Sequence, residues 1–445
     1  MGGGGLMQLV AYGAQDIYLT GNPFVTFFKV TYRRHTNFAI ESIEQVFNGT
    51  ATFGQKVSAT VSRNGDLINH VYLQVTAPSL TVGQVWGTNT APANVAWTNS
   101  FMHALVRYVT IEIGGQQIDK QYGTFLEIWD ELTQTAEKQN GYNQMVGKYA
   151  ASVGLIGNAN NPRIYYLPLM FWFCKNPGLS LPLIALQYHE VKINIEFRYA
   201  IELIVGLDSA GDRSNSTNTT TLADSSSIQL SNAALWIDYV YLDTDERRRF
   251  AQMSHEYLID QLQFTGGEAL IFGNTSNYKF KMNFNHPVKE LIWTLQRQDN
   301  FTVGTAYNDW FNFSAAAPGT PDPLAAVDLM AAAKILLNGH DRFAARPQTY
   351  FRLVQPWQCH TRVPTKHIYL YSFALRPEEH QPSGTCNFSR IDNATLTIDL
   401  TPPQSFPSNV NYSTWDTYDG QICIYAMNYN VLRIMSGMGG LAYSN

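Results

Sequence analysis

Charged residues are scarce in this chain. Asp, Glu, Lys and Arg make up 15% of its 445 residues, whereas hydrophobic residues make up 45%. Soluble proteins usually carry about a quarter charged residues, so much of this surface must be uncharged. The polar share lies in Asn, Thr, Ser, Gln and Tyr. This composition suits a protein covered by neighbours, or simply a β-rich protein, because Thr and Tyr favour strands.

A strongly basic character is also missing. The net charge is −5, whereas a protein that coats nucleic acid needs a basic face to neutralise phosphates. The basic clusters are Arg33-Arg34 and Arg247-Arg248-Arg249, and each is typical of a solvated or salt-bridged local run. We therefore expect no direct contact with nucleic acid.

Cysteine is rare and unpaired in the sequence. Cys174, Cys359, Cys386 and Cys423 form no C-x-x-C motif, which predicts buried free thiols in a reducing compartment. Met1 is followed by four glycines rather than by the basic and apolar regions of a secretory signal. No uncharged apolar run is long enough to span a bilayer. We therefore expect synthesis in the cytoplasm and no membrane insertion.

The sequence lacks the motifs of catalysis and of metal or cofactor binding. It contains no G-x-S-x-G and no P-loop. His255-Glu256 lacks a second histidine at helical spacing, and the ten histidines share no ligand-like spacing. We therefore predict no catalytic residue, no cofactor and no metal ligand, and we do not expect an enzyme.

The dominant pattern is the period-two alternation that marks strands with one buried face. Turn dipeptides punctuate it at Asn64-Gly65, Gly114-Gly115 and Asn338-Gly339. The clearest alternating runs are 71–75, 191–199, 278–284 and 394–400. Many strands without βαβ alternation predict an all-β chain, built as a sandwich, barrel or jelly roll.

Helical signals are few and fall between the strands. Three short helices are expected: one carrying Phe125, Ile128, Trp129 and Leu132 on one face, one in the Ala-rich segment 324–333, and one capped by Thr244. Long stretches rich in Gly, Pro, Ser, Thr and Asn are expected to be surface loops. These loops are 79–99, 206–227, 300–323 and 401–418.

The order of features repeats along the chain. Residues 111–118 and 335–342 are each a strand entering a glycine turn, and segments 166–196 and 369–399 run in the same order over the same length. The identities are weak, so chance remains an alternative. The order suggests two copies of one β-domain. We divide the chain into an N-terminal arm (1–23), a first domain (24–246), a linker (247–262) and a second domain (263–445).

Long matching segments occur in order from one end of the chain to the other. They are Gln8–Pro23, Thr26–Glu41, Ser62–Leu67, Glu112–Gln116, Leu181–Val191, His255–Phe264, Gln381–Thr395 and Tyr429–Tyr443. In these segments the chain resembles the major capsid proteins of nucleocytoplasmic large DNA viruses, the group that infects algae and amoebae. The four long loops do not obviously match, which leaves the outer surface undefined.

The resemblance implies two consecutive eight-stranded jelly-roll barrels with short helices in the connecting loops. It implies a homotrimer whose six similar barrels give a pseudo-hexagonal capsomer that tiles the facets of an icosahedral virion. Neighbouring capsomers and minor and penton capsid proteins are then the expected partners, with host-surface contact through outer loops. The chain would be made in the host cytoplasm and reside in the virion capsid.

Alternatives from other classes remain at this point. A minor capsid paralogue would share the fold, and a glycan- or receptor-binding jelly roll would be a monomer or small oligomer with a saturable sugar site. A cupin-like metalloenzyme would need clustered histidines, which the sequence lacks.

Two sets of residues are candidate sites in a capsid protein. We expect the apolar residues of the N-terminal segment to bind neighbouring or minor capsid proteins on the inner side of the shell; an added strand or plug of the first barrel is the alternative. This set is Leu6, Met7, Leu9, Val10, Ile17 and Leu19. Sequons in loops are candidate glycan-attachment sites. This set is Asn215, Asn218, Asn300, Asn312 and Asn411.

Overall fold

The computed structural model describes residues 3–24, 27, 30, 32–82, 93–149, 155–209, 228–272, 277–301, 308–316, 328–401 and 419–443. The chain forms two compact units, Met1–Phe38 and Ala39–Asn445. The first unit contains two short helices, α1 (Gly4–Val10) and α2 (Ile17–Thr20), and neither helix has a buried residue.

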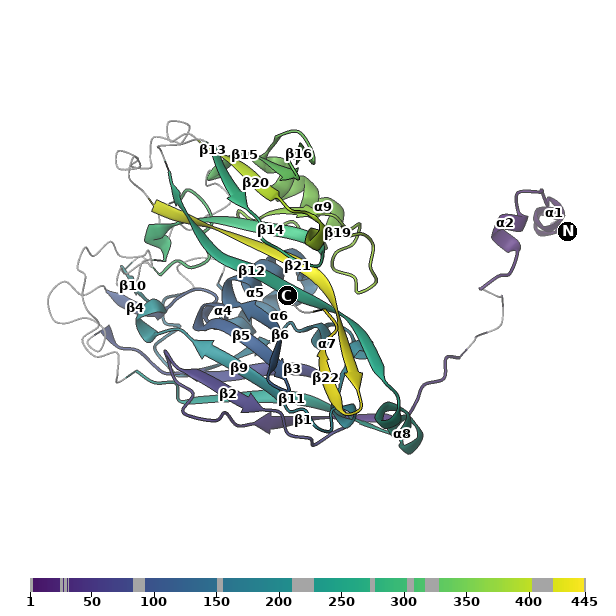
Figure 1. The fold of residues 1–445 in the computed structure, drawn as a ribbon, viewed down its shortest axis with the longest axis horizontal. Helices are drawn as coiled ribbons and strands as arrows, with labels where there is room; N and C mark the ends of the chain where they lie inside the picture. The colour runs from purple at the N-terminus through teal and green to yellow at the C-terminus, as the bar shows by residue number, and fades with distance from the viewer. Residues whose placement is uncertain are drawn as a thin grey trace. The chain divides into compact units, whose positions relative to one another are not determined.

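The first half of the second unit consists of two main sheets (Figure 1). One sheet has the strand order β1-β11-β3-β7, with β8 beside β3, and the other has the order β2-β9-β5-β6. Two further strands, β4 and β10, form a separate pair. The bounds are β1 Phe38–Gln45, β2 Lys56–Thr60, β3 Leu67–Ala77, β4 Asn94–Trp97, β5 Val106–Ile113, β6 Gln116–Tyr122, β7 Arg163–Pro168, β8 Leu181–Pro182, β9 Val191–Phe197, β10 Ile204–Leu207 and β11 Asn232–Leu242.

The second half repeats this arrangement. One sheet has the order β12-β21-β14-β18, with β19 beside β14 and β22 beside β21, and the other has the order β13-β20-β15-β16, with β17 beside β15. The bounds are β12 His255–Ile271, β13 Asn277–Lys281, β14 Pro287–Arg297, β15 Met330–Leu337, β16 His340–Asp341, β17 Arg346–Pro347, β18 Tyr369–Ser372, β19 Cys386–Asn387, β20 Ala394–Leu400, β21 Asp419–Met435 and β22 Met438–Leu441.

The two halves correspond strand for strand. Strands β1, β11, β3 and β7 match β12, β21, β14 and β18, and β2, β9, β5 and β6 match β13, β20, β15 and β16. Even the short strands β8 and β19 occupy equivalent places, beside β3 and β14. The predicted repeat is therefore real, and each half is an eight-stranded jelly roll.

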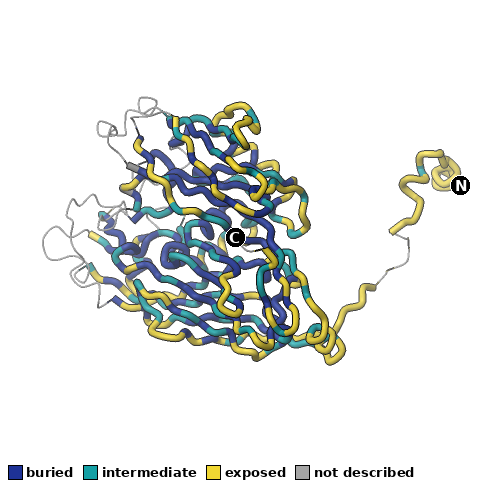
Figure 2. The backbone as a smooth tube through the Cα atoms, viewed as in Figure 1, coloured by how far each residue is buried: buried dark blue, intermediate teal, exposed yellow. Residues whose placement is uncertain are grey.

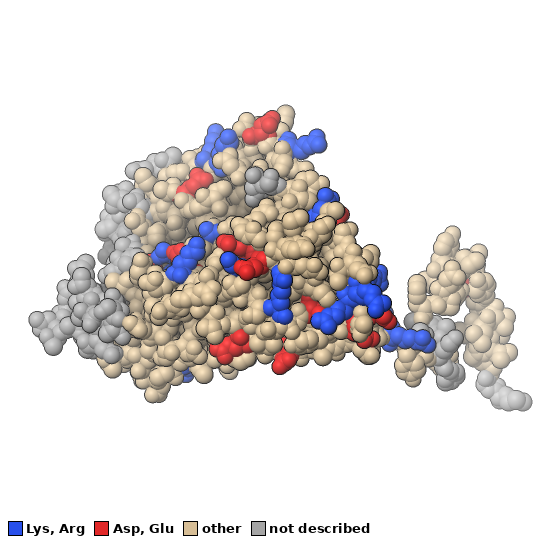
Figure 3. All heavy atoms as spheres, turned by 60° about the horizontal axis from the view of Figure 1, so that its bottom comes forward, with Lys and Arg blue, Asp and Glu red and all other residues tan. Residues whose placement is uncertain are grey.

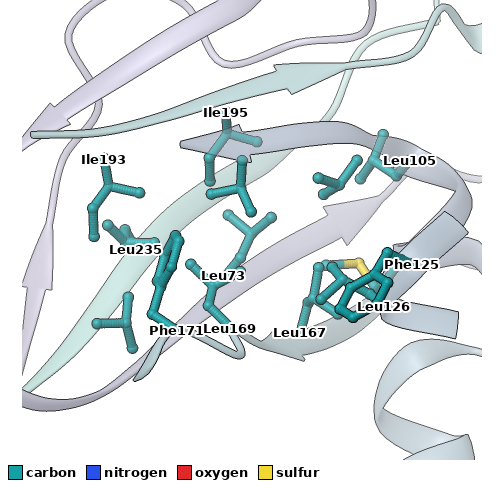
Figure 4. Close-up of a cluster of buried hydrophobic side chains, with 14 of the residues drawn as sticks. Leu73, Leu105, Phe125, Leu126, Leu167, Leu169, Phe171, Ile193, Ile195 and Leu235 are labelled. Carbon is teal, nitrogen blue, oxygen red and sulfur yellow. The ribbon is translucent and has the colours of Figure 1, made fainter. Parts of the chain in front are cut away.

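The core of the first jelly roll lies between its two sheets. Figure 4 shows Ile193 and Ile195 of β9 above Leu73 of β3, Leu167 of β7 and Leu235 of β11. All five are fully buried. Burial alternates along β2 and β3, because successive side chains point to opposite faces of a sheet. Figure 2 shows buried, intermediate and exposed positions following one another along the chain. Period-two patterning thus led correctly to the strands.

Helices fill the connections between strands, and two of the three expected ones occur. Their bounds are α4 Phe101–Leu105, α5 Gly123–Thr133, α6 Ala136–Val146, α7 Trp172–Lys175, α8 Thr244–Gln252, α9 Gln355–Cys359, η2 Pro177–Leu179, η3 Leu183–Ala185, η4 Ala200–Glu202, η6 Gln298–Asn300, η7 Tyr350–Val354 and η8 Phe388–Arg390. Within the described residues, no helix has the length and apolar character needed to cross a membrane.

Two helix expectations need correction. Residues 324–327 of the Ala-rich segment lie outside the described residues, and from Met330 the segment forms strand β15, which pairs with β20, rather than a helix. Alanine favours a helix by its intrinsic propensity, but pairing with β20 overrides this propensity and makes the segment a strand. The cap of α8 is Asp243 rather than Thr244: the Asp243 carboxylate accepts a hydrogen bond from the Thr244 N–H, at 2.8 Å. Helix α8 and the first part of β12 occupy the segment expected to be a linker.

Hydrogen bonds join the two jelly rolls in two places. Asn308 of the second jelly roll donates to the carbonyls of Ile201 and Ile204 in the first, each at 2.7 Å. At the C-terminal hairpin, the Leu441 N–H donates to Gln116 Oε1 at 3.2 Å. These contacts explain why residues 39–445 form a single compact unit.

A glycine substitution tests how tightly α5 is seated. A methyl group at Gly123, the first residue of α5, would fall far inside van der Waals contact with the carbonyl oxygens of His103 and Val106. We expect Gly123→Ala to lower the free energy of unfolding by about 1–3 kcal/mol, as overpacking does. Urea unfolding followed by tryptophan fluorescence measures this change.

The matched control is Gly141→Ala in α6, where an added methyl group meets no atom within 4 Å. This variant should gain about 0.5–1 kcal/mol, because alanine is the better helix former. Equal stability of the two variants would contradict the close seating of α5.

Candidate functional site at the junction of the two jelly rolls

Helix α5 of the first jelly roll takes part in the junction with the second, alongside β6 and α7, which contact β12. It follows β6, and its buried apolar residues Phe125, Ile128, Trp129 and Leu132 recur at helical spacing, as the sequence predicted. The ring of Phe125 lies 5.7 Å from that of Tyr425 on β21. The helix therefore packs its aromatic side chains on a sheet of the other jelly roll.

Three buried carboxylates of α5 lie within 4.8 Å of one another: Glu127, Asp130 and Glu131. Lys148, from the first jelly roll, lies 3.1, 2.7 and 2.7 Å from them respectively. Lys366, from the second jelly roll, forms a short ion pair with Glu127. The carboxylates are thus held between one ammonium group from each half.

Polar contacts from both halves complete this cluster. The backbone N–H and the hydroxyl of Thr365 donate to Glu131 Oε2, at 3.1 and 2.8 Å. His103 Nδ1 lies 2.6 Å from Glu127 Oε2, and His103 Nε2 lies 2.9 Å from the Tyr142 hydroxyl. Residues 127 and 366 lie far apart in sequence, so only the folded chain unites them.

The charges set the protonation of this cluster. Burial disfavours ionised Glu131, but Lys148 and Lys366 outweigh it and lower the pKa of Glu131 to about 2. Against the same burial, these two lysines also hold the pKa of Glu127 well below its usual range. Three clustered carboxylates are a donor set for a hard cation. Here Lys148 contacts all three and Lys366 pairs with Glu127, so the arrangement is an ion-pair network of two ammonium groups and three acids.

A second ionic cluster lies nearby on β12. Asp260 Oδ2 lies 3.1 Å from Lys289 Nζ and 3.5 Å from Lys175 Nζ of the first jelly roll. Asp119 of β6 accepts a hydrogen bond from the Leu262 N–H of β12, at 3.1 Å. Burial raises the pKa of Asp119 to about 6, even though its hydrogen bonds favour the ionised form. This cluster is a second polar link between the halves.

A buried histidine of the second jelly roll, His360, also lies at the junction. His360 Nε2 lies 2.8 Å from Glu290 Oε2, and His360 Nδ1 lies 2.8 Å from Glu378 Oε1. Its ring also stands edge-on to Trp129 of α5, at 6.3 Å. Burial disfavours the imidazolium, but Glu290 and then Glu378 outweigh it and raise the pKa of His360 to about 9.

The raised pKa of His360 predicts a pH dependence of stability. A group whose pKa is raised from 6.5 to about 9 on folding contributes stability below pH 6.5, and this contribution is lost as the pH rises through 9. The loss should be of the order of 3 kcal/mol. It is measured as the free energy of urea unfolding at pH 6.5 and at pH 9.5.

The control is Glu378→Gln, which keeps the hydrogen-bonding shape but removes one of the two charges that hold the His360 proton. Its stability should fall less over the same pH range than that of the unmodified chain. Parallel pH profiles for the two proteins would show that His360 does not carry the effect.

The residues predicted from the sequence are not among those that build this junction. Leu6, Met7, Leu9, Val10, Ile17 and Leu19 belong to the first unit, where their side chains are 59–83% exposed. Asn300 and Asn312 are buried, and the Asn300 amide donates to the Asn312 carbonyl at 3.0 Å. This burial argues against glycans at both positions. Asn215, Asn218 and Asn411 lie outside the described residues.

Sequence reasoning missed the ionic residues of the junction. The one available signal was the run Glu127, Asp130 and Glu131, which puts three acids among the apolar residues of one short helix. Lysine and glutamate are almost never fully buried unless they are paired. Nothing in the sequence pointed to Lys366 as the partner of Glu127, or to His360 as the partner of Glu290 and Glu378.

Comparisons with known proteins agree with the fold. Residues 26–243 match the model of the major capsid protein N-terminus, and residues 246–440 match that of the large eukaryotic DNA virus major capsid protein. The boundary between the two matches falls at the start of α8.

Similar proteins cover the whole chain. It is 49% identical to a major capsid protein of Pyramimonas orientalis virus, with 100% of both chains covered. It is 44% identical to the major capsid protein of Paramecium bursaria Chlorella virus 1, with 99% and 100% covered.

Solved structures agree as well. The PBCV-1 VP54 structure superposes with a TM-score of 0.76 at 37% identity, covering 94% of this chain and 100% of that one. The Faustovirus major capsid protein has a TM-score of 0.71 at 13% identity, with 95% and 94% covered, and shows the shared fold. On this combined evidence, the chain belongs to the family of major capsid proteins of large eukaryotic DNA viruses.

Proposed function

We propose that this chain builds the icosahedral shell of a large DNA virus as a homotrimeric capsomer with a structural, non-catalytic role. The observation that supports this most is the identical strand order of its two jelly rolls. Three chains with two equivalent jelly rolls each present six similar units, which gives a pseudo-hexagonal block. Each block is a closed symmetric trimer. Because its outline is roughly hexagonal, many such blocks can tile a flat facet.

The surface is consistent with a protein surrounded by neighbours. Figure 3 shows Lys, Arg, Asp and Glu in small scattered groups on a largely uncharged face. Arg247 of the basic run on α8 is paired with Asp66, at 2.8 Å. The expected partners are other copies, adjacent capsomers, and minor and penton capsid proteins. Outer loops would contact the host, and their sequons Asn215, Asn218 and Asn411 remain candidate glycan sites.

The oligomeric state tests this proposal directly. The purified chain should be a trimer whose contacts bury more than about 2,000 Å², as permanent complexes do. Multi-angle light scattering over a wide range of concentrations measures its mass. A stable monomer throughout that range would refute the capsomer.

We further propose that the N-terminal unit binds partners during shell assembly. Residues 3–24 of this unit form two short helices and no strand, whereas the alternative was an added strand or plug of the first barrel. Nothing within this unit covers its six apolar candidates, whose exposed fractions are 59–83%. Ordering a free segment costs about 1–2 kcal/mol per residue, so partners must supply the compensating apolar contacts.

Deletion of residues 2–20 tests this role. Trimers should still form and melt nearly normally, whereas assembly into shells should fail because the apolar docking segment is gone. Light scattering, thermal melting and electron microscopy of assembly reactions measure these three properties. Collapse of the trimer itself would instead make the segment a structural part of the first jelly roll.

A pair of point variants sharpens this test. Leu9→Asp places a charge at an apolar position of α1, and Gln8→Asp places the same charge at a neighbouring polar position. Only Leu9→Asp should impair assembly if the apolar face of α1 is the docking element.

A further inference from the structure

Strands β21, β14 and β18 of the sheet β12-β21-β14-β18, in the second jelly roll, are buried on both faces over most of their length. Tyr425, Ile292 and Leu370 form a row across these three strands, in register. They belong to the apolar cluster of the first jelly roll rather than to that of their own, and all three are at most 1% exposed. The cover includes α5, through Phe125.

The equivalent sheet of the first jelly roll, β1-β11-β3-β7, has no such cover among the described residues. Its outer row is Trp236, Tyr72 and Pro168, which are in register and only half-buried. The rings of Tyr72 and Trp236 stack at 6.3 Å. The flanking strands present Ile40 and Ile164, which are 52% and 50% exposed. An apolar and aromatic strip therefore faces outward here.

The second jelly roll has a helical segment between the strands that correspond to those flanking α5 in the first jelly roll. Segment η7–α9 follows β17 and precedes β18, as α5 follows β6 and precedes β7. Its residues Leu353, Val354 and Trp357 share one face through their spacing of three and four. They are 40%, 40% and 75% exposed, whereas Phe351 and Pro356 point inward.

We propose that the η7–α9 face of one copy docks on the outer face of the β1-β11-β3-β7 sheet of a second copy. This contact would repeat between chains the contact that α5 makes within one chain, and it rests on the proposed homotrimer. Each copy offers one donor face and one acceptor face, so the contact is head-to-tail. Three such contacts close a ring of six jelly rolls.

The repeat is what identifies a second copy as the occupant. The acceptor sheet matches, strand for strand, the sheet that receives α5, and the exposed donor segment stands in the position of α5. The donor segment also adjoins the internal contact, because His360, the residue after α9, stands against Trp129 of α5. An exposed tryptophan flanked by aliphatic residues also has the composition of an interface anchor.

The contact between copies should differ from the internal one in its electrostatics. Helix α5 brings three carboxylates to the junction, whereas residues 350–359 contain no acidic residue. The docking of η7–α9 is therefore apolar, and trimer formation should be insensitive to salt.

Three glutamate substitutions in the full chain test the proposal. Trp357→Glu disrupts the donor face, Ile164→Glu disrupts the acceptor face, and Met253→Glu is the control. Met253 is 54% exposed at the end of α8, outside both faces. Light scattering should show trimers for the control and monomers for the other two. The milder Trp357→Ala should weaken trimer association roughly 30-fold or more, as loss of an interface anchor does.

Mixing the two monomeric variants tests the head-to-tail geometry. The Trp357→Glu chain keeps an intact acceptor face, and the Ile164→Glu chain keeps an intact donor face. An equimolar mixture should therefore form heterodimers that cannot close into trimers. Thermal melting of each variant shows whether it is folded. A misfolded glutamate variant is replaced by the corresponding alanine variant in the same assays.

The outcomes separate this inference from the trimer itself. If the unmodified chain is a monomer, the proposed capsomer fails. If the unmodified chain is a trimer and folded Trp357→Glu and Ile164→Glu variants remain trimers, the capsomer stands and these docking faces are wrong. Monomeric variants that give no heterodimer would also overturn the head-to-tail contact.

Discussion

The double burial of the β12-β21-β14-β18 sheet is the constraint on which the rest of the molecule depends. A jelly roll needs only the inner face of each sheet for its own core. Here the outer row of Tyr425, Ile292 and Leu370 is as apolar and as buried as the inner one. This second jelly roll would expose a large apolar sheet on its own, so it requires the first as its cover.

Covering the sheet with α5 also buries carboxylates of this helix, and the ionic network pairs them. Helix α5 turns its aromatic residues to the sheet, and its carboxylates Glu127 and Glu131 are buried with them. Unpaired buried charges cost several kcal/mol each, and removing one partner of a buried pair typically costs about 3–5 kcal/mol. Lys366 and Thr365 meet these carboxylates from the second jelly roll. When the two jelly rolls dock in this way, the apolar row is buried and the buried carboxylates are paired at the same time.

Much of the fold could be predicted from the sequence because its signals are local. Alternation at 191–199 and 394–400 marks β9 and β20, and the glycine turns at Gly114-Gly115 and Asn338-Gly339 mark equivalent hairpins. The junction could not be predicted, because its pairs join distant residues, from 85 positions apart for Lys175 and Asp260 to 239 for Glu127 and Lys366. The Ala-rich segment misled for a related reason: its state depends on the distant strand β20 rather than on its own propensity.

The low charge of the chain acquires a physical meaning from the same junction. Several of its few charged residues, such as Glu127, Lys366 and Asp260, are paired inside the molecule, where they link the two jelly rolls. On the face shown in Figure 3, the remaining charged residues are sparse and of mixed sign. A large net charge would keep copies apart by mutual repulsion. A chain with a net charge of −5 instead lets many copies lie side by side. Specificity must then come from shape and apolar matching rather than from long-range attraction, and that is the kind of matching the repeated jelly rolls provide.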